Sequence, residues 1–322
     1  MNRWEAGTDW PAGTTEALTA AGLDPDRVRS VVRDALAEDL GIGGAVVQVP
    51  GAAPGHDVTS ESTIGADVEG EAHLIARSSG VISGMPLVPV VLAEVAAWTG
   101  ATVRPVVEVL RADGEEVERD DVLAVLRGPV QVLLIAERTL LNLVCRTSGI
   151  STHTRRWARE LAGTGAQVLD TRKTTPGLRM LEKYAVRAGG GTNKRMGLYD
   201  VAMVKDNHKI AAGSVAAAYR RVGERFPEVA VQVEVTTPAE AVEAVRAGAR
   251  FLLCDNMSTA VLAESVRVAR AAVDAPVEIE ATGGLTLEVA NEYARTGVDY
   301  LSVGGLTHSS PILDLAIDLV QT

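Results

Sequence analysis

Residues 229–255 have the sequence VAVQVEVTTPAEAVEAVRAGARFLLCD, in which two apolar runs flank a helical pattern. The runs Val229–Val235 and Phe251–Asp255 are short and apolar, which is typical of strands buried on both faces of a sheet. Pro238–Ala247, between them, has the apolar spacing of a helix. A strand, a helix and a second strand in this order predict a βαβ unit with parallel strands.

The same alternation runs through the second half of the chain. It predicts four further strands, at Gln167–Asp170, Val201–Lys205, Val277–Ala281 and Tyr300–Val303. Helices are expected at Ser214–Arg225, Ser258–Ala272, Leu287–Arg295 and Ile312–Val320. Six strands at this even spacing favour an α/β barrel over an open doubly wound sheet.

The first half has a different organisation. Residues 1–24 lack apolar periodicity and are expected to form a loose arm. A helix is predicted from Asp24-Pro25 to Gly41, because Asp is a favoured N-cap and Pro suits the first turn. The remaining elements of this α+β layer are expected as strands at Glu71–Arg77, Thr102–Leu110 and Asp121–Arg127 and helices at Pro86–Trp98 and Val130–Cys145.

Charge is distributed unevenly along the 322 residues. The chain has 31 Lys and Arg against 42 Asp and Glu, and its net charge of −11 argues against nucleic-acid binding. All five lysines nevertheless lie between Lys173 and Lys209, and residues 170–209 hold nine basic and four acidic side chains. This local positive excess suits a small polyanionic ligand.

Targeting signals are not recognisable in the sequence. Met1–Trp10 lacks the basic and apolar regions of a signal peptide, and the longest apolar stretch, Val81–Trp98, is interrupted by polar residues and prolines. Cys145 and Cys254 lie in apolar stretches, which favours two buried free thiols over a disulfide. A cytoplasmic protein without membrane association is therefore expected.

Candidate functional residues follow the predicted strands. The carboxyl ends of parallel barrel strands form one rim, where active sites lie. That rim would collect Asp170–Lys173, Lys205, Glu234, Asp255 and His308. Two glycine turns, Thr282–Gly284 and Gly304-Gly305, suit phosphate binding through backbone N–H groups. Glu234 and Asp255 are candidates for ribose hydroxyls or Mg²⁺, whereas His153 is placed at a helix start with a capping or core role.

Several motifs resemble the quinolinate phosphoribosyltransferase family, the carboxylating nicotinate-nucleotide pyrophosphorylases. The most specific are Asp170-Thr-Arg-Lys-Thr-Thr-Pro-Gly-Leu-Arg179, Gly189-Gly-Gly-Thr-Asn-Lys-Arg195 and Lys205-Asp-Asn-His208. Supporting motifs are Asp57–Ser60, Glu137–Asn142, Glu280–Gly284 and Ser302–Ser309, so the resemblance covers nearly the whole chain.

The resemblance implies a reaction and an assembly. Quinolinate and phosphoribosyl pyrophosphate would give nicotinate mononucleotide, pyrophosphate and CO₂, with Mg²⁺ as cofactor. The implied fold is an N-terminal α+β sandwich domain (25–148) and a C-terminal, seven-stranded, partly open α/β barrel with the active site (149–308). The loose arm (1–24) precedes them, and a C-terminal helix (309–322) packs back. A homodimer is implied, in which the sandwich of one subunit closes over the barrel of the other.

The resemblance also assigns roles by matching position. Lys173, Lys205, Glu234 and Asp255 are the implied catalytic residues, and the two carboxylates would also hold Mg²⁺, largely through substrate. Quinolinate would bind Arg138 of the partner subunit. The further implied substrate-binding residues are Thr171, Arg172, Lys194, Arg195, Thr282, Gly283, Gly284, Gly304, Gly305, Leu306 and His308.

The sequence departs from the family at three places, the mildest of which is Thr282, where the family more often has Ser and the hydroxyl is kept. Lys194 stands where the family usually has His, and residues 42–56 are inserted into a usually short connection. Three other interpretations remain open: a related phosphoribosyltransferase-like barrel of altered specificity, an aldolase-type barrel with a Schiff base on Lys205, and a non-catalytic nucleotide sensor.

Overall fold

The computed structural model describes residues 4, 9–43 and 49–320, so part of the 42–56 insertion and of the N-terminal arm lies outside the described residues. The chain forms two compact units, each built from separate segments. The first unit comprises residues 1–152, 176–188 and 311–322, and the second comprises 153–175 and 189–310. Residues 176–188 therefore pack with the first unit, although they lie inside the range expected for the barrel.

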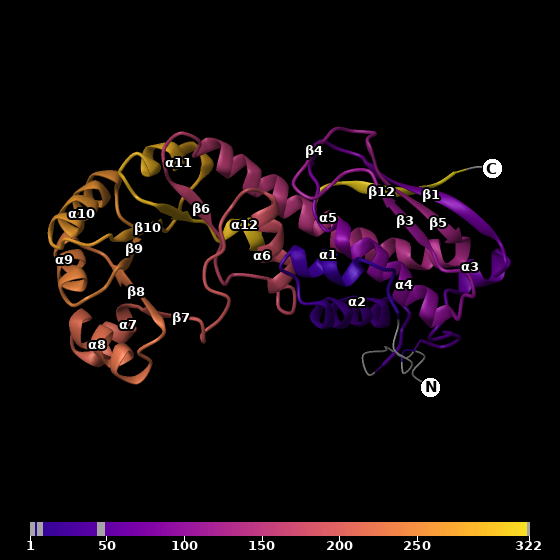
Figure 1. Cartoon of the computed structure of the whole chain (residues 1–322), viewed down its shortest axis with the longest axis horizontal. Helices are drawn as coiled ribbons and strands as arrows, with labels where there is room; N and C mark the ends of the chain where they lie inside the picture. The colour runs from indigo at the N-terminus through magenta and orange to yellow at the C-terminus, as the bar shows by residue number, and fades with distance from the viewer. Residues whose placement is uncertain (1–3, 5–8, 44–48, 321–322) are drawn as a thin grey trace. The chain divides into compact units, whose positions relative to one another are not determined.

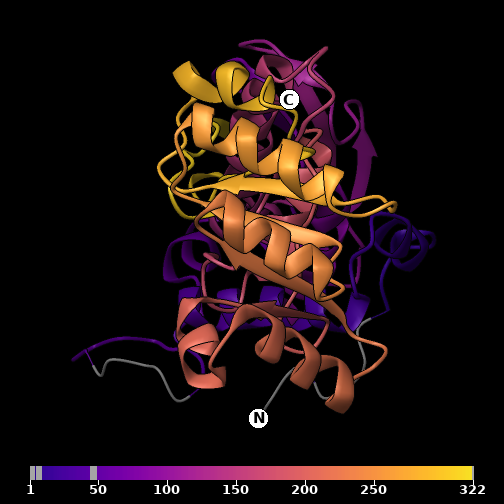
Figure 2. The same ribbon diagram turned by 90° about the vertical axis from the view of Figure 1, so that its left-hand side faces the viewer.

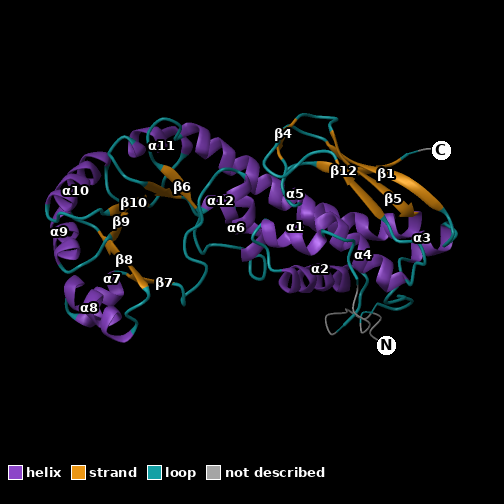
Figure 3. Cartoon of the chain, viewed as in Figure 1, coloured by secondary structure: helices purple, strands orange, loops and turns teal. Residues whose placement is uncertain are grey.

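The first unit is a mixed α+β domain, as expected (Figure 3). Its main sheet has the strand order β12-β1-β5-β3, and every neighbouring pair is antiparallel. These strands are β1 (Glu69–Ala76), β3 (Val106–Val109), β5 (Val122–Pro129) and β12 (Leu315–Leu319). A separate two-stranded sheet pairs β2 (Gly80–Val81) with β4 (Glu116–Val117).

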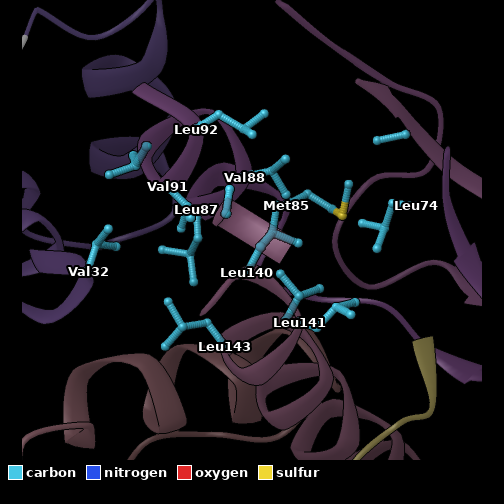
Figure 4. Close-up of a cluster of buried hydrophobic side chains, with 14 of the residues drawn as sticks. Val32, Leu74, Met85, Leu87, Val88, Val91, Leu92, Leu140, Leu141 and Leu143 are labelled. Atoms are coloured by element: carbon cyan, nitrogen blue, oxygen red, sulfur yellow. The ribbon is translucent and has the colours of Figure 1, made fainter. Parts of the chain in front are cut away.

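All helices of the first unit except α3 bury apolar residues in one shared core. Figure 4 shows part of it, where Val32, Leu74, Val91 and Leu140 come from four different elements. The helices are α1 (Thr14–Ala20), α2 (Pro25–Asp39), α3 (Val58–Thr63), the short η1 (Met85–Leu87), α4 (Val88–Thr99), α5 (Val130–Glu160) and α6 (Arg179–Ala188). The predicted start of α2 is confirmed, because the Asp24 carboxylate accepts the Arg27 N–H at 2.9 Å.

The expectation of a loose arm over residues 1–24 was wrong for its described part. Residues 14–20 form α1, and Leu18 is completely buried. Trp10 Nε1 donates to the buried Glu94 carboxylate at 2.8 Å, and Trp4 Nε1 donates to the Glu94 carbonyl at 3.1 Å. A few large side chains, Trp4, Trp10 and Leu18, thus hold this segment against the rest of the unit. Because they are widely spaced, the segment shows no apolar periodicity.

The predicted C-terminal helix is also wrong, because residues 315–319 form strand β12. Leu313, Leu315, Ile317 and Leu319 alternate with less apolar residues, the period of a strand rather than of a helix. β12 pairs antiparallel with β1, with Leu315 opposite Ala76 and Leu319 opposite Ala72. Close to this segment, Gly149 lets Ile312 approach α5, since an added Cβ would lie 2.7 Å from Ile312 Cα.

The second unit is a parallel α/β sheet with the strand order β6-β11-β10-β9-β8-β7. The strands are β6 (Gln167–Leu169), β7 (Val201–Val204), β8 (Ala230–Val235), β9 (Phe251–Asp255), β10 (Glu278–Thr282) and β11 (Tyr300–Ser302). The helices are α7 (Asp206–Ala212), α8 (Val215–Arg225), α9 (Pro238–Arg246), α10 (Thr259–Ala271), α11 (Leu287–Ala294) and α12 (Gly305–His308). Helices α8 to α11 cover one face of this sheet (Figures 1 and 2).

This arrangement confirms the predicted α/β fold class, and all six strands expected from the sequence are present. The resemblance had implied seven strands. The described residues instead form six, together with a lone parallel bridge between Leu169 of β6 and Thr192. The sheet is open between β6 and β7, the first and second strands in the chain. No described helix is both long and apolar enough to cross a membrane.

Candidate active site

A pocket of about 870 Å³ lies at the carboxyl ends of the parallel strands. All of its lining residues belong to the second unit. They include fourteen of the sixteen residues proposed from the sequence, from Thr171 after β6 to His308 in α12. The topology brings these residues together because parallel strands direct all their carboxyl ends to the same edge.

Two proposed residues do not line this pocket. Leu306 is completely buried, so its side chain belongs to the core rather than to a binding surface. Arg138 is exposed on α5 in the first unit. Among the described residues of its own chain, Arg138 forms no ion pair with a carboxylate. A role for Arg138 in a partner's site stays a prediction.

The pocket concentrates positive charge. Arg172, Lys173, Lys194, Arg195 and Lys205 all line it. Burial lowers the pKa of Arg195, and the neighbouring Arg172 guanidinium lowers it further. Such crowding of like charges is costly without a counter-charge, so the pocket is suited to an anion with several negative groups.

Two carboxylates face these cations from neighbouring strands. Glu234 is the penultimate residue of β8 and Asp255 is the last residue of β9, and both line the pocket. Lys205 Nζ lies 3.1 Å from Glu234 Oε2. The side chain of Asn256, at a left-handed φ of 52°, donates to Asp255 Oδ2 at 2.9 Å. The pocket thus offers oxygen ligands beside a cation, Lys205, whose side chain is half exposed.

Asp170 fixes the segment that forms one wall of the pocket by hydrogen bonds. Its buried carboxylate accepts the Lys194 backbone N–H and the Asn193 side-chain N–H, each at 2.7 Å. It follows β6, so it ties the segment that carries Lys194 and Arg195 to the barrel. Asp170 therefore holds the site in place and is not one of the residues that line the pocket.

The Lys194 ammonium is itself buried and paired. It forms an ion pair with Glu280, which is completely buried on β10. Gln232 Nε2, on β8, donates to the other oxygen of Glu280 at 2.5 Å. The sequence motifs assigned a substrate-binding role to Lys194 but no role to Glu280 or Gln232. The sequence does contain a signal for them, because polar residues occupy alternate positions of otherwise apolar strands, and a buried polar side chain needs a partner.

Glycines bring backbone close to the charged side chains. An added Cβ at Gly304 would lie 2.9 Å from Lys173 Cδ and 3.2 Å from His308 Nε2. Gly283 has φ of +99°, and a Cβ there would lie 3.0 Å from the Asn256 backbone nitrogen. Both turns follow strands of the parallel sheet, where their N–H groups are available to a phosphate.

His153 and Trp157 form a wall of the pocket that the sequence did not reveal. His153 lies inside α5 rather than at a helix start, because α5 continues to Glu160. Its Nε2 accepts the Trp157 indole N–H at 3.2 Å, and its Nδ1 lies 2.8 Å from Ser310 Oγ. Burial, with a smaller effect of Arg156, lowers its pKa. An imidazole nitrogen that accepts a hydrogen bond carries no proton, so this contact and the lowered pKa both favour the neutral form of His153. The i,i+4 spacing of His153 and Trp157 was the available signal.

Both halves of the chain match models of known protein families. Residues 57–148 match the family model of the quinolinate phosphoribosyl transferase N-terminal domain, and residues 150–318 match that of the C-terminal domain. The chain is 42% identical over 295 residues to a nicotinate-nucleotide pyrophosphorylase [carboxylating] of Mycobacterium leprae, covering 91% of this chain and 98% of the relative.

Another relative and a solved structure carry the names of the same enzyme family. A quinolinate phosphoribosyltransferase [decarboxylating] of Nicotiana glauca is 36% identical, covering 91% of this chain and 82% of the relative. The solved nicotinate-nucleotide pyrophosphorylase of Francisella tularensis superposes with a TM-score of 0.82 at 31% identity, covering 92% of this chain and 98% of that one. With both family models matched in order along the chain, this protein belongs to the quinolinate phosphoribosyltransferase family.

Proposed function

We propose that the chain transfers the phosphoribosyl group of phosphoribosyl pyrophosphate to quinolinate and releases pyrophosphate and CO₂, giving nicotinate mononucleotide. The single observation that supports this most strongly is the pocket in which five cations face two carboxylates. Quinolinate is a dianion and phosphoribosyl pyrophosphate is heavily anionic, so both substrates complement the cations. Relatives named as carboxylating or decarboxylating enzymes support the same reaction.

The proposed chemistry needs no nucleophile from the protein. The pyridine nitrogen attacks C1′ of the ribose while the bond from C1′ to pyrophosphate breaks. Lys173 and Lys205 are proposed to stabilise the departing pyrophosphate, and Glu234 and Asp255 to stabilise positive charge on the sugar. The alkylated nitrogen then accepts the electron pair released when the bond to the adjacent carboxylate breaks, and a proton takes the place of CO₂ on the ring.

Mg²⁺ is proposed as the cofactor. Glu234 and Asp255 supply the oxygen donors that Mg²⁺ prefers. Within the described residues, no three His, Cys, Asp or Glu side chains are grouped so that they could hold a metal. Two carboxylates and substrate oxygens would therefore share the ion, which would neutralise phosphate charge when bound.

A homodimer with a shared site is also proposed. Arg138 is exposed and has no carboxylate partner among the described residues of its own chain, which suits a residue that completes a neighbour's pocket. A cytoplasmic location is proposed as well, since both cysteines are buried free thiols, which suits a reducing compartment.

The decisive test of the reaction is its stoichiometry. Purified protein with Mg²⁺ and phosphoribosyl pyrophosphate is expected to consume quinolinate and to release one CO₂ for each, and to leave nicotinate unchanged. Consumption of nicotinate without CO₂ would instead favour a phosphoribosyltransferase of altered specificity.

Subunit mixing tests the shared site. Arg138→Ala and Arg172→Ala should each be inactive, and their mixture should regain part of the activity, because a mixed dimer contains one intact site. No recovery after verified subunit exchange would contradict the role of Arg138.

A further inference from the structure

A buried group of three polar side chains, Lys194, Glu280 and Gln232, lies behind the pocket wall. Glu280 on β10 and Gln232 on β8 are both completely buried, and the side chain of Lys194 is 9% exposed. Strand β9 lies between β10 and β8, so the Gln232 and Glu280 side chains meet across β9. Of the three, only Lys194 lines the pocket.

We propose that Glu280 and Gln232 are positioning residues, which hold the Lys194 ammonium charged and in place so that it binds a carboxylate of the dicarboxylic substrate. This inference rests on the proposed function, since it concerns how the same pocket binds quinolinate. It assigns a role to two residues that do not themselves contact the substrate.

The first argument is the charge around Lys194. Burial lowers the pKa of Lys194, and the nearby cations Arg195 and Lys205 lower it further. Glu280 raises it, through its charge and its hydrogen bond. A buried ammonium beside two other cations would lose its proton readily without that carboxylate.

The groups around the pair come from four elements. Glu280 faces Lys194 from β10 and Gln232 from β8, whereas Lys205 follows β7. The Cys254 thiol on β9 is neutral, because burial and the Glu280 charge raise its pKa to about 12. The Asp170 carboxylate is engaged by the Lys194 backbone N–H and by Asn193. Glu280 forms the ion pair with the Lys194 ammonium that this structure shows.

The second argument is the orientation of the Gln232 amide. Its N–H group donates to Glu280 Oε2, while its Oε1 is buried with no hydrogen-bond partner among the described residues. Leaving a buried carbonyl unsatisfied is unfavourable, so the interaction with Glu280 decides the orientation. Both oxygens of Glu280 accept hydrogen bonds, as an ionised carboxylate does. Gln232 thus fixes the carboxylate without adding a charge.

The test compares Glu280→Gln with Glu278→Gln, an exposed glutamate on the same strand. Glu280→Gln should raise the KM for quinolinate by about 10- to 100-fold, as expected for one weakened charge-assisted contact, with little change in the KM for phosphoribosyl pyrophosphate. Because the lost carboxylate had raised the Lys194 pKa, the alkaline limb of the quinolinate KM profile should move to lower pH. Glu278→Gln should leave both unchanged.

A direct titration supplies a readout that does not depend on activity. The chain has only five lysines, so ¹³C-labelled lysine gives few signals, and Lys194→Met identifies one of them. The Lys194 pKa should fall in Glu280→Gln and stay unchanged in Glu278→Gln. Should Glu280→Gln fail to fold, Glu280→Asp offers a second variant. Its shorter side chain keeps the negative charge but holds it farther from the Lys194 ammonium, so it should also lower the Lys194 pKa.

A double variant separates positioning from general stability. If Glu280 acts through Lys194, Lys194→Met/Glu280→Gln should bind quinolinate no more weakly than Lys194→Met alone. Additive losses, or an unchanged Lys194 pKa and quinolinate KM in the Glu280 variants, would overturn the inference while the wild-type activity stands. Failure of the wild type to release CO₂ from quinolinate would instead refute the proposed function.

Discussion

Asp170→Asn should loosen the pocket wall that carries Lys194. The carboxylate accepts two N–H groups at 2.7 Å from a completely buried position. An amide of the same shape offers one oxygen and one NH₂ group, so one of the two N–H donors must face another donor in either orientation. We expect a loss of about 1.5–3 kcal/mol of stability, the value of a hydrogen bond to a charged group.

The assay combines thermal unfolding with steady-state kinetics. A loss of this size corresponds to a decrease of roughly 3–12 °C in the unfolding midpoint for a unit of this size. Because the displaced segment carries Lys194 and Arg195, the KM for quinolinate should also rise, by about tenfold or more if one charge-assisted contact is weakened.

Asp299→Asn provides a control at the opposite end of the strands. Asp299 precedes β11, and one oxygen of its carboxylate, Oδ2, accepts both the Ile279 N–H at 2.7 Å and an Arg270 N–H at 2.9 Å. An amide oxygen in that place keeps both hydrogen bonds, so this variant should lose less stability than Asp170→Asn and leave the quinolinate KM unchanged. An unchanged KM in Asp170→Asn, or an equal rise in Asp299→Asn, would refute the reasoning.

Three further predictions concern other parts of the chain. Gly283→Ala should lower the unfolding midpoint and raise the KM for phosphoribosyl pyrophosphate, because its positive φ costs about 1–3 kcal/mol in other residues and the new Cβ would displace Asn256. Cys145 and Cys254 should not react with a thiol reagent in the native protein at neutral pH, because burial raises the pKa of both thiols; urea should expose two thiols per chain, and rapid native labelling would contradict this. At Asp57, the N-cap of α3, burial raises the carboxyl pKa but hydrogen bonds from the first helical turn outweigh it, so the pKa is lowered. Asp57→Ala should therefore cost about 0.5–2 kcal/mol at neutral pH, and the cost should shrink as the pH falls below about 4; a cost independent of pH in urea titrations would argue against this.

Local patterns in the sequence were sufficient to predict the strands of the parallel sheet and most of the helices that pack with it. Buried parallel strands such as Phe251–Asp255 are continuous apolar runs, and the helices between them have a separate period. Once these strands are taken as parallel, their carboxyl ends must share an edge, so residues as distant as Lys173 and His308 could be assigned to one pocket before any coordinates were known.

Only the tertiary structure showed which residues serve packing and which serve the pocket. Leu306 lies in a predicted binding motif, yet its side chain is in the core. The anchored segment around Trp10 depends on a partner far away in the chain, so local periodicity could not predict it. The alternation from Leu313 to Leu319 does indicate a strand, but only the tertiary structure shows that its partner is β1. Glu280 and Gln232 meet across an intervening strand, and no sequence spacing records that contact. The sequence therefore carries the charges and the order of the strands, whereas the pairing of each charge is decided by the fold, because burial and distance set its energy.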